Sequence, residues 1–577
     1  MTPEILLHDA ARQQWLHFHS PLEVLSSNTP AEVQTILNTV EARVENENVY
    51  AAGFLTYEAA TAFDPACQVS TSGNLPLVWF GLFESSTAVP APAPSVEPVT
   101  LSWKPSWTKD EFSRAVAQVH TAIAAGETYQ VNLTFPLESP FSGSPRHFFE
   151  TLVHGQKAGY AAYLDLGEQV ICSFSPELFF RKEGRQLLMR PMKGTRARGL
   201  TCQEDRWQAD KLRASDKDRA ENIMILDMVR NDLGRLAEPG KVRTTELCTL
   251  EKYPTVWQMT STVAAESSAS LAEIMSALFP CASITGAPKF RTMALIKQLE
   301  QRPRDIYTGC IGYLAPQGRA QFNVAIRTVL IDREKRSASY GVGAGITWDS
   351  SPAEEYDECL QKARILTRHM PDFSLFETLL WQPGEGYWLL NEHLDRLLAS
   401  ADYFDFPCDR HQLVTILQHV ADSLTDTPYK VRLLLAATGA IHHEAVCFDG
   451  AENDRLVRLR LAPDPINPDD PFLYHKTTVR GLYERAREGH PDCDDVILWT
   501  PAGEVTETTI ANLVLDLEGS LVTPPVSCGL LPGTFRAHLL ITGQLQERVV
   551  SIADLKRSKR IFLINALRGW REARLLE

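Results

Sequence analysis

Short apolar runs and longer segments with apolar residues at every third or fourth position alternate along the chain. Runs such as residues 161–166 and 169–174 are rich in Val, Ile, Tyr and Leu, which is typical of β-strands. The longest helical pattern covers residues 206–236, where apolar residues recur at the spacing of one helix face. After residue 380, residues 388–404 repeat the helical spacing, and strand-like runs follow at 430–438 and 495–500.

Two breaks interrupt this pattern. Residues 88–99 are rich in proline, which cannot continue a helix or a central strand, so they predict a loop or linker. At residues 369–380 a helical pattern ends near Pro371 and strand-like alternation begins. We place the domain boundary there, with one domain over residues 1–370 and another over 373–577. Because both parts mix helices and strands, we expect an α+β protein.

Composition and charge narrow the classes of function. The 577 residues carry 57 basic and 72 acidic side chains, a net charge of −15, and 44% are hydrophobic, as in ordinary globular proteins. An acidic surface repels phosphate backbones and anionic lipids, so we expect no nucleic-acid or membrane partner. The eleven cysteines form no C-x-x-C pair, the N-terminus lacks a leader pattern, and no apolar run approaches ~18 residues. The sequence therefore predicts a cytoplasmic protein with reduced thiols.

Acidic residues at helical spacing form the first candidate site. Glu355, Glu358 and Lys362 share one face of a helix that begins after Pro352, and taken alone they would be a solvated ion pair. Glu221 lies in the long helical pattern, and two helices that each offer a carboxylate can hold one Mg²⁺. The glycine-rich residues 341–346 lack the context of a nucleotide loop but leave a backbone that a carboxylate can approach.

Eight ordered segments resemble the chorismate-utilising enzymes, which include anthranilate, aminodeoxychorismate, isochorismate and salicylate synthases. The resemblance covers residues 105–368, and 53–65 more weakly, and it implies a β-sandwich flanked by helices. The segments are SPELFF (175–180), RPMKGTRARG (190–199), DRAENIMILDMVRNDLGR (218–235), SITGAPK (283–289), YTGCIGY (307–313), NVAIRT (323–328), GAGI (343–346) and the acidic run from Glu355.

Lys193 distinguishes members of this family, because anthranilate synthases carry Ala at this position and aminodeoxychorismate synthases carry Lys. In an apolar, glycine-flanked turn a lysine loses solvation, which lowers its pKa and frees a neutral amine for attack. The resemblance implies that Lys193 attacks C2 of chorismate while Glu177 protonates the departing C4 hydroxyl. Ammonia then adds at C4 and expels the lysine.

The resemblance also implies the groups that bind the substrate and the metal. Mg²⁺ would lie on Glu221 and Glu358, with Glu355 close by. The carboxylates of chorismate would be held by Thr285, Tyr307, Arg327, Lys362 and the backbone of Gly343, Ala344 and Gly345. Two positions depart from the family: Gln258 stands where many relatives carry His, and Met192 replaces Ile.

The source of ammonia is a separate expectation. The sequence contains no G-x-C-x-G nucleophile elbow, and the nearest string, around Cys310, belongs to the YTG segment. A separate glutamine amidotransferase subunit is therefore expected, unless free ammonia suffices.

Residues 373–577 resemble the fold-type IV pyridoxal-phosphate enzymes, which have two subdomains and include aminotransferases and aminodeoxychorismate lyase. The matching segments are FSLFETLL (373–380), NEHLDRLLASA (391–401), YHKTTVRGLY (474–483), GEVTETTIANLVL (503–515), LVTPPVSCGLLPGTFR (521–536) and FLINALRGW (562–570). The resemblance implies Lys476 as the cofactor lysine, Arg396 for the phosphate and Glu507 for the pyridine nitrogen. Asn512, Gly533 and Thr534 complete the implied cofactor site. Taken alone, Arg396 and Glu507 would be surface charges.

Together the two resemblances favour a bifunctional enzyme that makes 4-aminobenzoate, because the product of the first domain is the substrate of the second. The alternatives are an anthranilate synthase-like domain joined to a branched-chain or D-amino-acid aminotransferase, and a scaffold with decayed sites. The sequence leaves open whether the intermediate is channelled, whether the chain dimerises through its C-terminal domain, and whether the N-terminal region binds a regulatory ligand.

Overall fold

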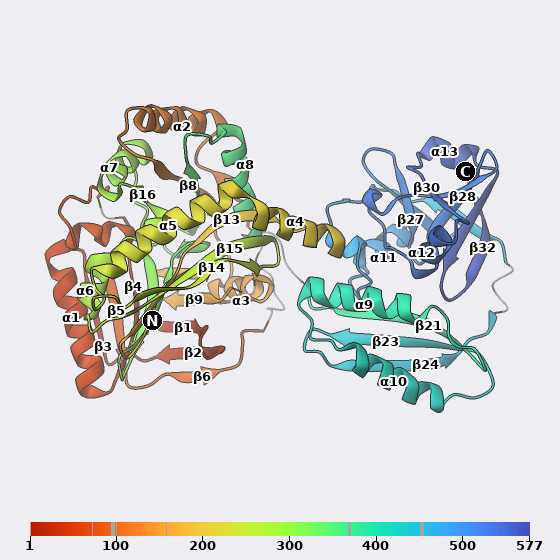
Figure 1. Ribbon diagram of the computed structural model, residues 1–577, viewed down its shortest axis with the longest axis horizontal. Helices are drawn as coiled ribbons and strands as arrows, with labels where there is room; N and C mark the ends of the chain where they lie inside the picture. The colour runs from red at the N-terminus through yellow and green to blue at the C-terminus, as the bar shows by residue number, and fades with distance from the viewer. Residues whose placement is uncertain are drawn as a thin grey trace. The chain divides into compact units, whose positions relative to one another are not determined.

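The computed structural model describes residues 2–71, 73–93, 99, 101–156, 158–366, 371–450 and 455–576. The chain forms two compact units, the first made of Met1–Ala197 and Ala209–Met370 and the second of Arg198–Gln208 and Pro371–Glu577. Both units contain helices and sheets, so the predicted mixed class and the two-part arrangement are confirmed (Figure 1). The sequence did not predict that residues 198–208, which interrupt the first unit in sequence, belong to the second unit.

Two large antiparallel sheets build the first unit. Within the described residues each has ten strands. The first sheet runs in the order β16 (Gly286–Ala287), β8 (Gln130–Pro140), β20 (Ser337–Ile346), β19 (Thr328–Asp332), β10 (Gln169–Ser175), β9 (Tyr160–Asp165), β1 (Glu4–Asp9), β2 (Gln14–His19) and β6 (Thr87–Val89), with β7 (Lys104–Pro105) beside β8. The second runs in the order β13 (Met192–Ala197), β15 (Val256–Glu266), β12 (Gln186–Arg190), β11 (Leu178–Glu183), β18 (Arg319–Val324), β17 (Cys310–Ala315), β4 (Tyr50–Leu55), β5 (Val78–Phe83) and β3 (Glu23–Ser27), with β14 (Val242–Lys252) beside β15.

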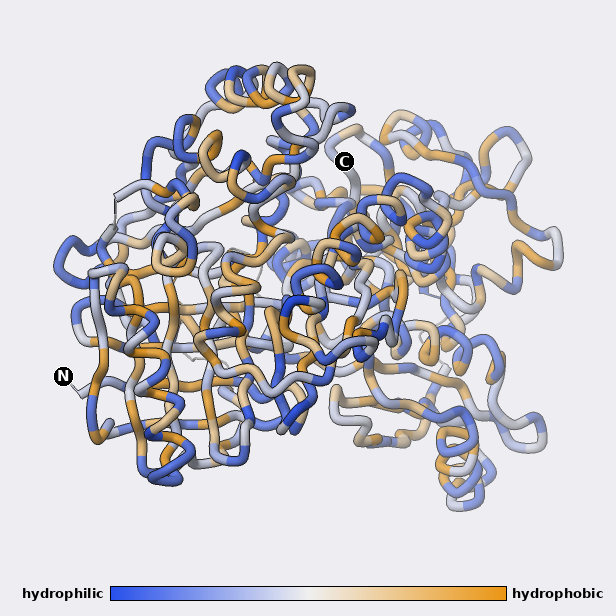
Figure 2. Tube along the Cα trace, turned by 60° about the vertical axis from the view of Figure 1, so that its left-hand side comes forward, coloured by the Kyte–Doolittle hydropathy of each residue, from blue (hydrophilic) through white to orange (hydrophobic). Residues whose placement is uncertain are grey.

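Apolar side chains of both sheets meet in one cluster that includes Phe18 and Leu164 from the first sheet and Phe54 and Ile311 from the second. Figure 2 shows hydrophobic residues along these strands. Helices contribute to two further core clusters. Those packed with the second sheet are α1 (Pro30–Glu47), α5 (Asp216–Gly234) and α6 (Leu271–Leu278), and those packed with the first are α2 (Lys109–Ala124), α3 (Pro145–Gln156), α7 (Lys289–Glu300) and α8 (Pro352–Ala363).

The helical pattern over residues 206–236 is divided between two helices, α4 (Cys202–Ala214) and α5. Ser215 separates them because its backbone is extended and its side chain accepts the N–H of Asp218, which caps α5. The Pro-rich stretch contributes its residues 88 and 89 to β6, and residues 94–98 and 100 lie outside the described part of the chain.

The second unit contains two sheets. The smaller runs in the order β22 (Gly386–Tyr387), β21 (Ser374–Gln382), β23 (Tyr429–Ala436) and β24 (Ile441–Cys447), and α9 (Leu390–Phe404) and α10 (Arg410–Asp422) share its core. The larger runs in the order β27 (Val505–Thr508), β26 (Asp495–Trp499), β25 (Val457–Leu461), β32 (Gly569–Leu575), β31 (Arg560–Asn565), β28 (Asn512–Leu517), β29 (Ser520–Thr523) and β30 (Gln546–Glu547). Its helices are α11 (Gly481–Glu488), α12 (Thr534–Ile541) and α13 (Ile552–Arg557).

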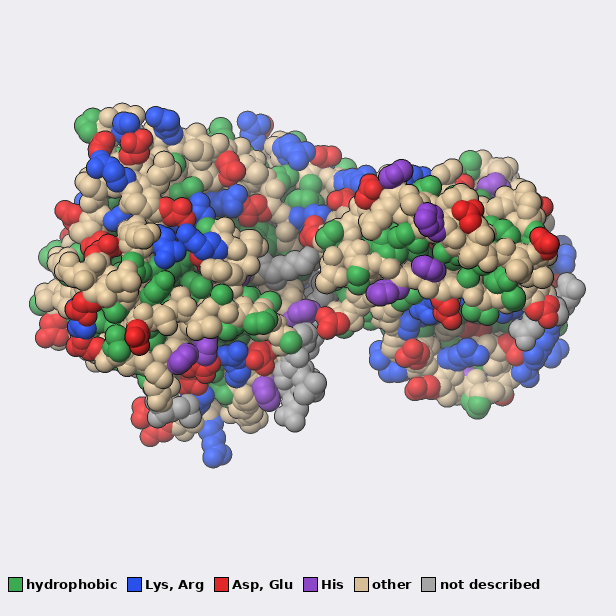
Figure 3. All heavy atoms as spheres, turned by 90° about the horizontal axis from the view of Figure 1, so that it is seen from below, with side chains coloured by type: hydrophobic (Ala, Val, Ile, Leu, Met, Phe, Trp, Pro, Cys, Tyr) green, Lys and Arg blue, Asp and Glu red, His purple; other side chains and the backbone are tan. Residues whose placement is uncertain are grey.

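The surface carries both signs of charge, and acidic and basic side chains are mixed over the face seen in Figure 3. Among the helices of the described residues, none has the length and apolar character that crossing a membrane requires. All eleven cysteines are free thiols.

Candidate active sites

Lys193 lies on β13, at the edge of the second sheet, and so belongs to a strand rather than to the expected turn. Its carbonyl accepts a hydrogen bond from Asn222 Nδ2 at 3.1 Å. The carbonyl of Gly194 accepts one from Gln258 Nε2 at 2.8 Å, and Gln258 Oε1 accepts one from Thr195 Oγ1 at 2.9 Å. Gln258, the residue that departs from the family, therefore holds the strand that carries Lys193.

Glu177 is a buried acid beside this strand, with 2% of its surface exposed. Ser283 Oγ donates a hydrogen bond to Glu177 Oε1 at 2.7 Å, and the N–H of Met192 also bonds to this carboxyl group. Burial raises the pKa of Glu177 to about 7, against the opposing effects of these hydrogen bonds and of Lys193. A carboxyl group with this pKa can hold and release a proton near neutral pH, as a general acid must.

We predict that kcat for the amination of chorismate, the reaction expected of the first unit, falls at high pH because Glu177 loses its proton. The carboxylic acid is present below its pKa of about 7 and is lost as the pH rises through that value, so kcat should fall above neutrality. Glu177→Gln should remove this fall and lower kcat by about 10²- to 10⁴-fold. Steady-state rates measured from pH 5.5 to 9 check the prediction, and a variant that keeps the same fall would assign it to another group.

The amine of Lys193 lies against Gly345 and an acid. Lys193 Nζ is 3.8 Å from Glu221 Oε2. A Cβ atom added to Gly345 would lie 2.5 Å from Lys193 Nζ and 2.6 Å from Gln130 Nε2, closer than side-chain atoms approach one another. The sequence therefore needs glycine at position 345 for the amine to reach this place. Gly345 pairs with Asn132 on β8, whose N–H donates to the carbonyl of Thr285 at 2.8 Å.

Gly345→Ala should displace the Lys193 amine and lower kcat of the first reaction by about 10²-fold, because a shift near 1 Å at a reacting group has effects of this size. The matched control is Gly234→Ala, at the last residue of α5, where an added Cβ meets no atom within 4 Å. Both variants should keep the wild-type unfolding midpoint within a few degrees. Equal rates for the two variants would contradict the placement of the amine.

Three glutamates predicted to surround a metal lie on α5 and α8. Glu358 forms an ion pair with Lys362 at 2.8 Å, which lowers the pKa of Glu358, and Lys362 Nζ also donates to the carbonyl of Gly343 at 2.9 Å. Glu355 accepts from Ser350 Oγ at 2.7 Å, and burial raises its pKa. The charge of Lys193 opposes the rise in the pKa of Glu355 and adds to the lowering of the pKa of Glu358. In the described residues no group of three His, Cys, Asp or Glu side chains is placed to hold a metal ion.

Arg327 is a half-buried cation with its backbone at φ 51°. Burial lowers its pKa, and its guanidinium carbon lies 5.9 Å from the ring centre of Tyr253. Tyr307 packs its ring against Gly341, and the hydroxyl of Thr285 bonds to backbone carbonyls. Within the described part of the chain, no hydrogen bond or ion pair joins Arg327, Tyr307 or Thr285 to Lys193.

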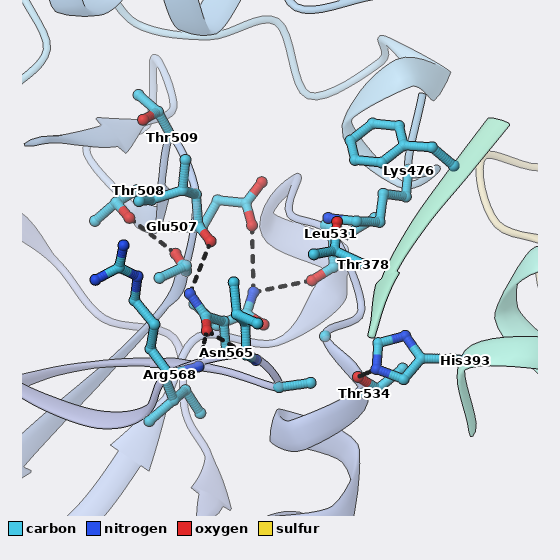
Figure 4. Close-up of a pocket in the computed structure, with 18 of the residues that line it drawn as sticks. Thr378, His393, Lys476, Glu507, Thr508, Thr509, Leu531, Thr534, Asn565 and Arg568 are labelled. Atoms are coloured by element: carbon cyan, nitrogen blue, oxygen red, sulfur yellow. Dashed lines mark hydrogen bonds between the residues drawn. The ribbon is translucent and has the colours of Figure 1, made fainter. Parts of the chain in front are cut away.

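All six residues predicted for the cofactor line one cavity of about 430 Å³ in the second unit. They are Arg396, Lys476, Glu507, Asn512, Gly533 and Thr534. Figure 4 shows Lys476 and Glu507 directed into this cavity from separate segments, with Thr534 and His393 at another part of its wall. The structure therefore brings together residues that span more than a hundred positions of sequence.

Lys476 is half-buried, with Nζ 4.7 Å from the ring centre of Phe376. Burial, and then the positive charge of Arg396, lowers the pKa of Lys476 to about 8. Such a lysine supplies a neutral amine more readily than an exposed one.

Glu507 is a buried acid in the wall of the same cavity. Tyr483 donates its hydroxyl to Glu507 Oε1 at 3.2 Å, and Asn512 Nδ2 donates to Oε2 at 3.2 Å. Burial raises the pKa of Glu507 to about 8, although Lys476 and Arg480 oppose the rise. An acid in this state gains stability from a protonated ring nitrogen beside it, because the pair neutralises a buried charge.

Arg396 and the N-terminus of α12 form the end of the cavity that can bind an anion. Arg396 bonds to both oxygens of Glu377, at 2.8 and 2.7 Å, and to the carbonyl of Pro532 at 3.0 Å. These contacts use three of its five N–H groups, which leaves two for a phosphate. A Cβ on Gly533 would lie 2.0 Å from Asn512 Oδ1, so only glycine fits at the N-terminus of α12.

Two residues of this site were missed in the sequence. Glu377 orients Arg396, and His393 Nδ1 lies 2.7 Å from Glu377 Oε2. Against the effect of burial, Arg396 and His393 hold the pKa of Glu377 below its ordinary value. Tyr483 was missed as well. The cavity also has four basic side chains that were not predicted: Lys430, Arg432, Arg480 and Arg568.

Comparison with known proteins decides the family. Residues 2–368 match the family described as chorismate binding enzyme. The chain belongs to the chorismate-binding enzyme family. Residues 374–576 of this chorismate-binding enzyme match amino-transferase class IV.

The relatives of this chorismate-binding enzyme include two kinds of synthase. It is 39% identical over 283 residues to aminodeoxychorismate synthase component 1 of Salmonella typhimurium, covering 48% of this chain and 62% of that protein. It is 35% identical over 274 residues to anthranilate synthase component 1 of Aquifex aeolicus, covering 47% and 55%. The crystal structure of anthranilate synthase component I from Streptococcus pneumoniae has the same fold, with a TM-score of 0.54 and 23% identity over 64% of this chain and 92% of that one. The chain thus spans 62% and 55% of the length of these two curated relatives.

Proposed function

We propose that the chain makes 4-aminobenzoate in two reactions, amination of chorismate to 4-amino-4-deoxychorismate and then elimination of pyruvate. The observation that carries this proposal is the placement of Lys193. Lys193 lies on β13, whose residue Met192 bonds to the buried acid Glu177. The amine of Lys193 lies against Gly345 of β20 and Glu221 of α5. By resemblance, anthranilate synthases carry Ala at this position.

In the first reaction the amine of Lys193 attacks C2 of chorismate, and the C4 hydroxyl leaves with the proton of Glu177. Ammonia then adds at C4, and Lys193 leaves C2 with its electron pair. The ammonia comes from a separate glutamine amidotransferase subunit, in keeping with the name "component 1" of the Salmonella relative. Gln258 and Asn222 hold the backbone of the nucleophile through both steps.

The oxygen ligands near Lys193 fit a magnesium ion, which binds one or two protein carboxylates and keeps places for substrate oxygens. Glu221, which lies 3.8 Å from Lys193, and Glu358, which lies 2.8 Å from Lys362, would hold it, with Glu355 nearby. The ion would neutralise the ring carboxylate of chorismate. Arg327, Tyr307, Thr285 and the backbone of β20 would hold the other anionic groups.

The cavity of the second unit fits pyridoxal phosphate. Gly533 leaves room at the start of α12, Arg396 has two N–H groups to offer, and Glu507 can pair with a ring nitrogen. When bound, pyridoxal phosphate stabilises negative charge at the substrate carbon from which a proton is removed.

Lys476 takes the C4 proton of 4-amino-4-deoxychorismate. The bond between C3 and the enolpyruvyl oxygen breaks, pyruvate leaves, and the ring becomes aromatic. This substrate has two carboxylates, and the four basic side chains around the cavity suit such a dianion.

Product identification tests the whole proposal. Purified full-length protein is incubated with chorismate, ammonium, Mg²⁺ and pyridoxal phosphate, and the products are separated by chromatography and identified by mass. We expect 4-aminobenzoate and pyruvate in equal amounts. Accumulation of anthranilate would overturn the role of Lys193, and 4-amino-4-deoxychorismate without 4-aminobenzoate would overturn the role of the second unit.

A further inference from the structure

The segment Arg198–Gln208 belongs to the second unit, although in sequence it directly follows β13, the strand of Lys193. Arg198 and Asp205 are almost fully buried, with 5% and 6% of their side chains exposed, and they share two hydrogen bonds of 2.6 and 2.8 Å. Arg198 Nη2 also donates to the carbonyl of Tyr403 on α9 at 2.9 Å, and its guanidinium lies 4.4 Å from the ring centre of Tyr403. The segment is therefore an integral part of the cofactor-binding unit.

The ring of His475 connects this segment with α9. His475 Nε2 lies 3.2 Å from the carbonyl of Leu200, and Nδ1 lies 2.9 Å from Ser400 Oγ. Burial lowers the pKa of His475 to about 3, so the ring is neutral. Because a carbonyl can only accept, Nε2 carries the hydrogen and Nδ1 accepts from the hydroxyl of Ser400. The ring also contacts Tyr403, with 4.3 Å between ring centres.

The carbonyl of Leu200 is itself held in place. Tyr403 donates its hydroxyl to the carbonyl of Gly199 at 2.9 Å, and the N–H of Gly199 donates to Asp205 Oδ1 at 3.0 Å. A Cβ on Gly199 would lie 2.2 Å from the backbone nitrogen of Asp205, so this tight turn needs glycine. The Leu200 carbonyl that His475 contacts is thus fixed within a buried network, so loss of this hydrogen bond should cost more free energy than loss of an exposed one.

We propose that His475 is a positioning residue for Lys476, and that Leu200 fixes His475 from a segment embedded in the chorismate-binding part of the sequence. This inference rests on the function proposed for the second unit. The His475 ring anchors the backbone on one side of Lys476, while the carbonyl of Lys476 accepts the N–H of Phe376 on β21 at 3.0 Å. With both restraints present, the amine of Lys476 is held over the Phe376 ring at the cavity wall.

Two substitutions at position 475 separate the contact with Leu200 from the contact with Ser400. His475→Gln can still donate at the reach of Nε2, to Leu200. His475→Asn is shorter and can still accept from Ser400 at the position of Nδ1, but it cannot reach Leu200. Arg198→Ala breaks the network behind Leu200. The matched control is Arg206→Ala, on the same segment, whose ion pair with Asp402 of α9 is exposed, with 69% and 57% of the side chains accessible.

The experiment measures the circular dichroism of bound pyridoxal phosphate in full-length protein, divided by the amount of cofactor bound, together with its dissociation constant. We expect His475→Asn and Arg198→Ala to change the signal per bound cofactor and to weaken binding by about tenfold, the effect of one lost buried hydrogen bond. His475→Gln and Arg206→Ala should match the wild type. Thermal unfolding of the loaded proteins is recorded alongside.

The results distinguish the possible failures. A change in unfolding midpoint without any change in the signal per bound cofactor would mean that the network serves stability alone, and the inference would be overturned. Equal effects of His475→Asn and His475→Gln would remove Leu200 from the argument. A wild-type protein that binds no pyridoxal phosphate would instead overturn the function proposed for the second unit.

Discussion

Lys476→Ala is expected to stop 4-aminobenzoate formation while chorismate is still consumed, so that 4-amino-4-deoxychorismate accumulates. Lys476 lies in the cavity with a pKa lowered to about 8, and its amine is 4.7 Å from the ring centre of Phe376. Removing the group that takes the C4 proton should lower the rate of the second reaction by about 10³-fold or more. Chromatography of both products over time measures the effect.

The control for this prediction is Lys559→Ala, which removes an exposed lysine of the same unit and should leave both reactions unchanged. Visible absorbance of the bound cofactor should persist in the control and change in Lys476→Ala. If the Lys476→Ala protein still forms 4-aminobenzoate at a tenth of the wild-type rate, another group must remove the proton.

Lys193→Ala is expected to abolish the first reaction and spare the second. The amine of Lys193 lies 3.8 Å from Glu221 and fills the space beside Gly345. Loss of the nucleophile should lower the amination rate by about 10³-fold or more. Added 4-amino-4-deoxychorismate should still be converted to 4-aminobenzoate, because the cavity of the second unit is unchanged.

Lys335→Ala is the control in the first unit, since the Lys335 side chain is 59% exposed and pairs with Asp332. Chorismate binding should be retained within a few-fold by Lys193→Ala, because Arg327 and the β20 backbone remain. A Lys193→Ala protein that aminates chorismate at the wild-type rate would show that ammonia attacks the ring without a lysine nucleophile.

The residues that the sequence predicts for a cofactor each lie in a short motif with its own chemistry. Lys476, Arg396 and Glu507 come from segments far apart, and the structure places all three on one cavity. Glu377 could not be predicted from a motif, since a single acid in the apolar strand FSLFETLL reads as a residue on the solvent-facing side of a strand. Its role depends on Arg396 and His393, which reach it only in the folded unit.

Local patterns also failed where a polar residue changes the path of the chain. Ser215 continues the helical pattern of residues 206–236, and only its capping bond to Asp218 reveals the break between α4 and α5. No local pattern in the sequence shows that Arg198–Gln208 belongs to the second unit either. Its buried partners, Tyr403 and His475, are more than two hundred residues further along the chain.

Because Arg198–Gln208 belongs to the second unit, the order of synthesis affects how that unit folds. Leu200 and His475 are separated by 275 positions, and at 5–20 residues per second the ribosome needs roughly 15–55 s to make the chain between them. Arg198 and Asp205 are only seven positions apart, so their ion pair can form at once and keep the turn at Gly199 closed during this wait. The second unit is thus completed only when residues 371–577 pack with Arg198–Gln208, which is synthesised much earlier. A ribosome that stalls after residue 370 leaves Arg198–Gln208 without its partners Tyr403 and His475.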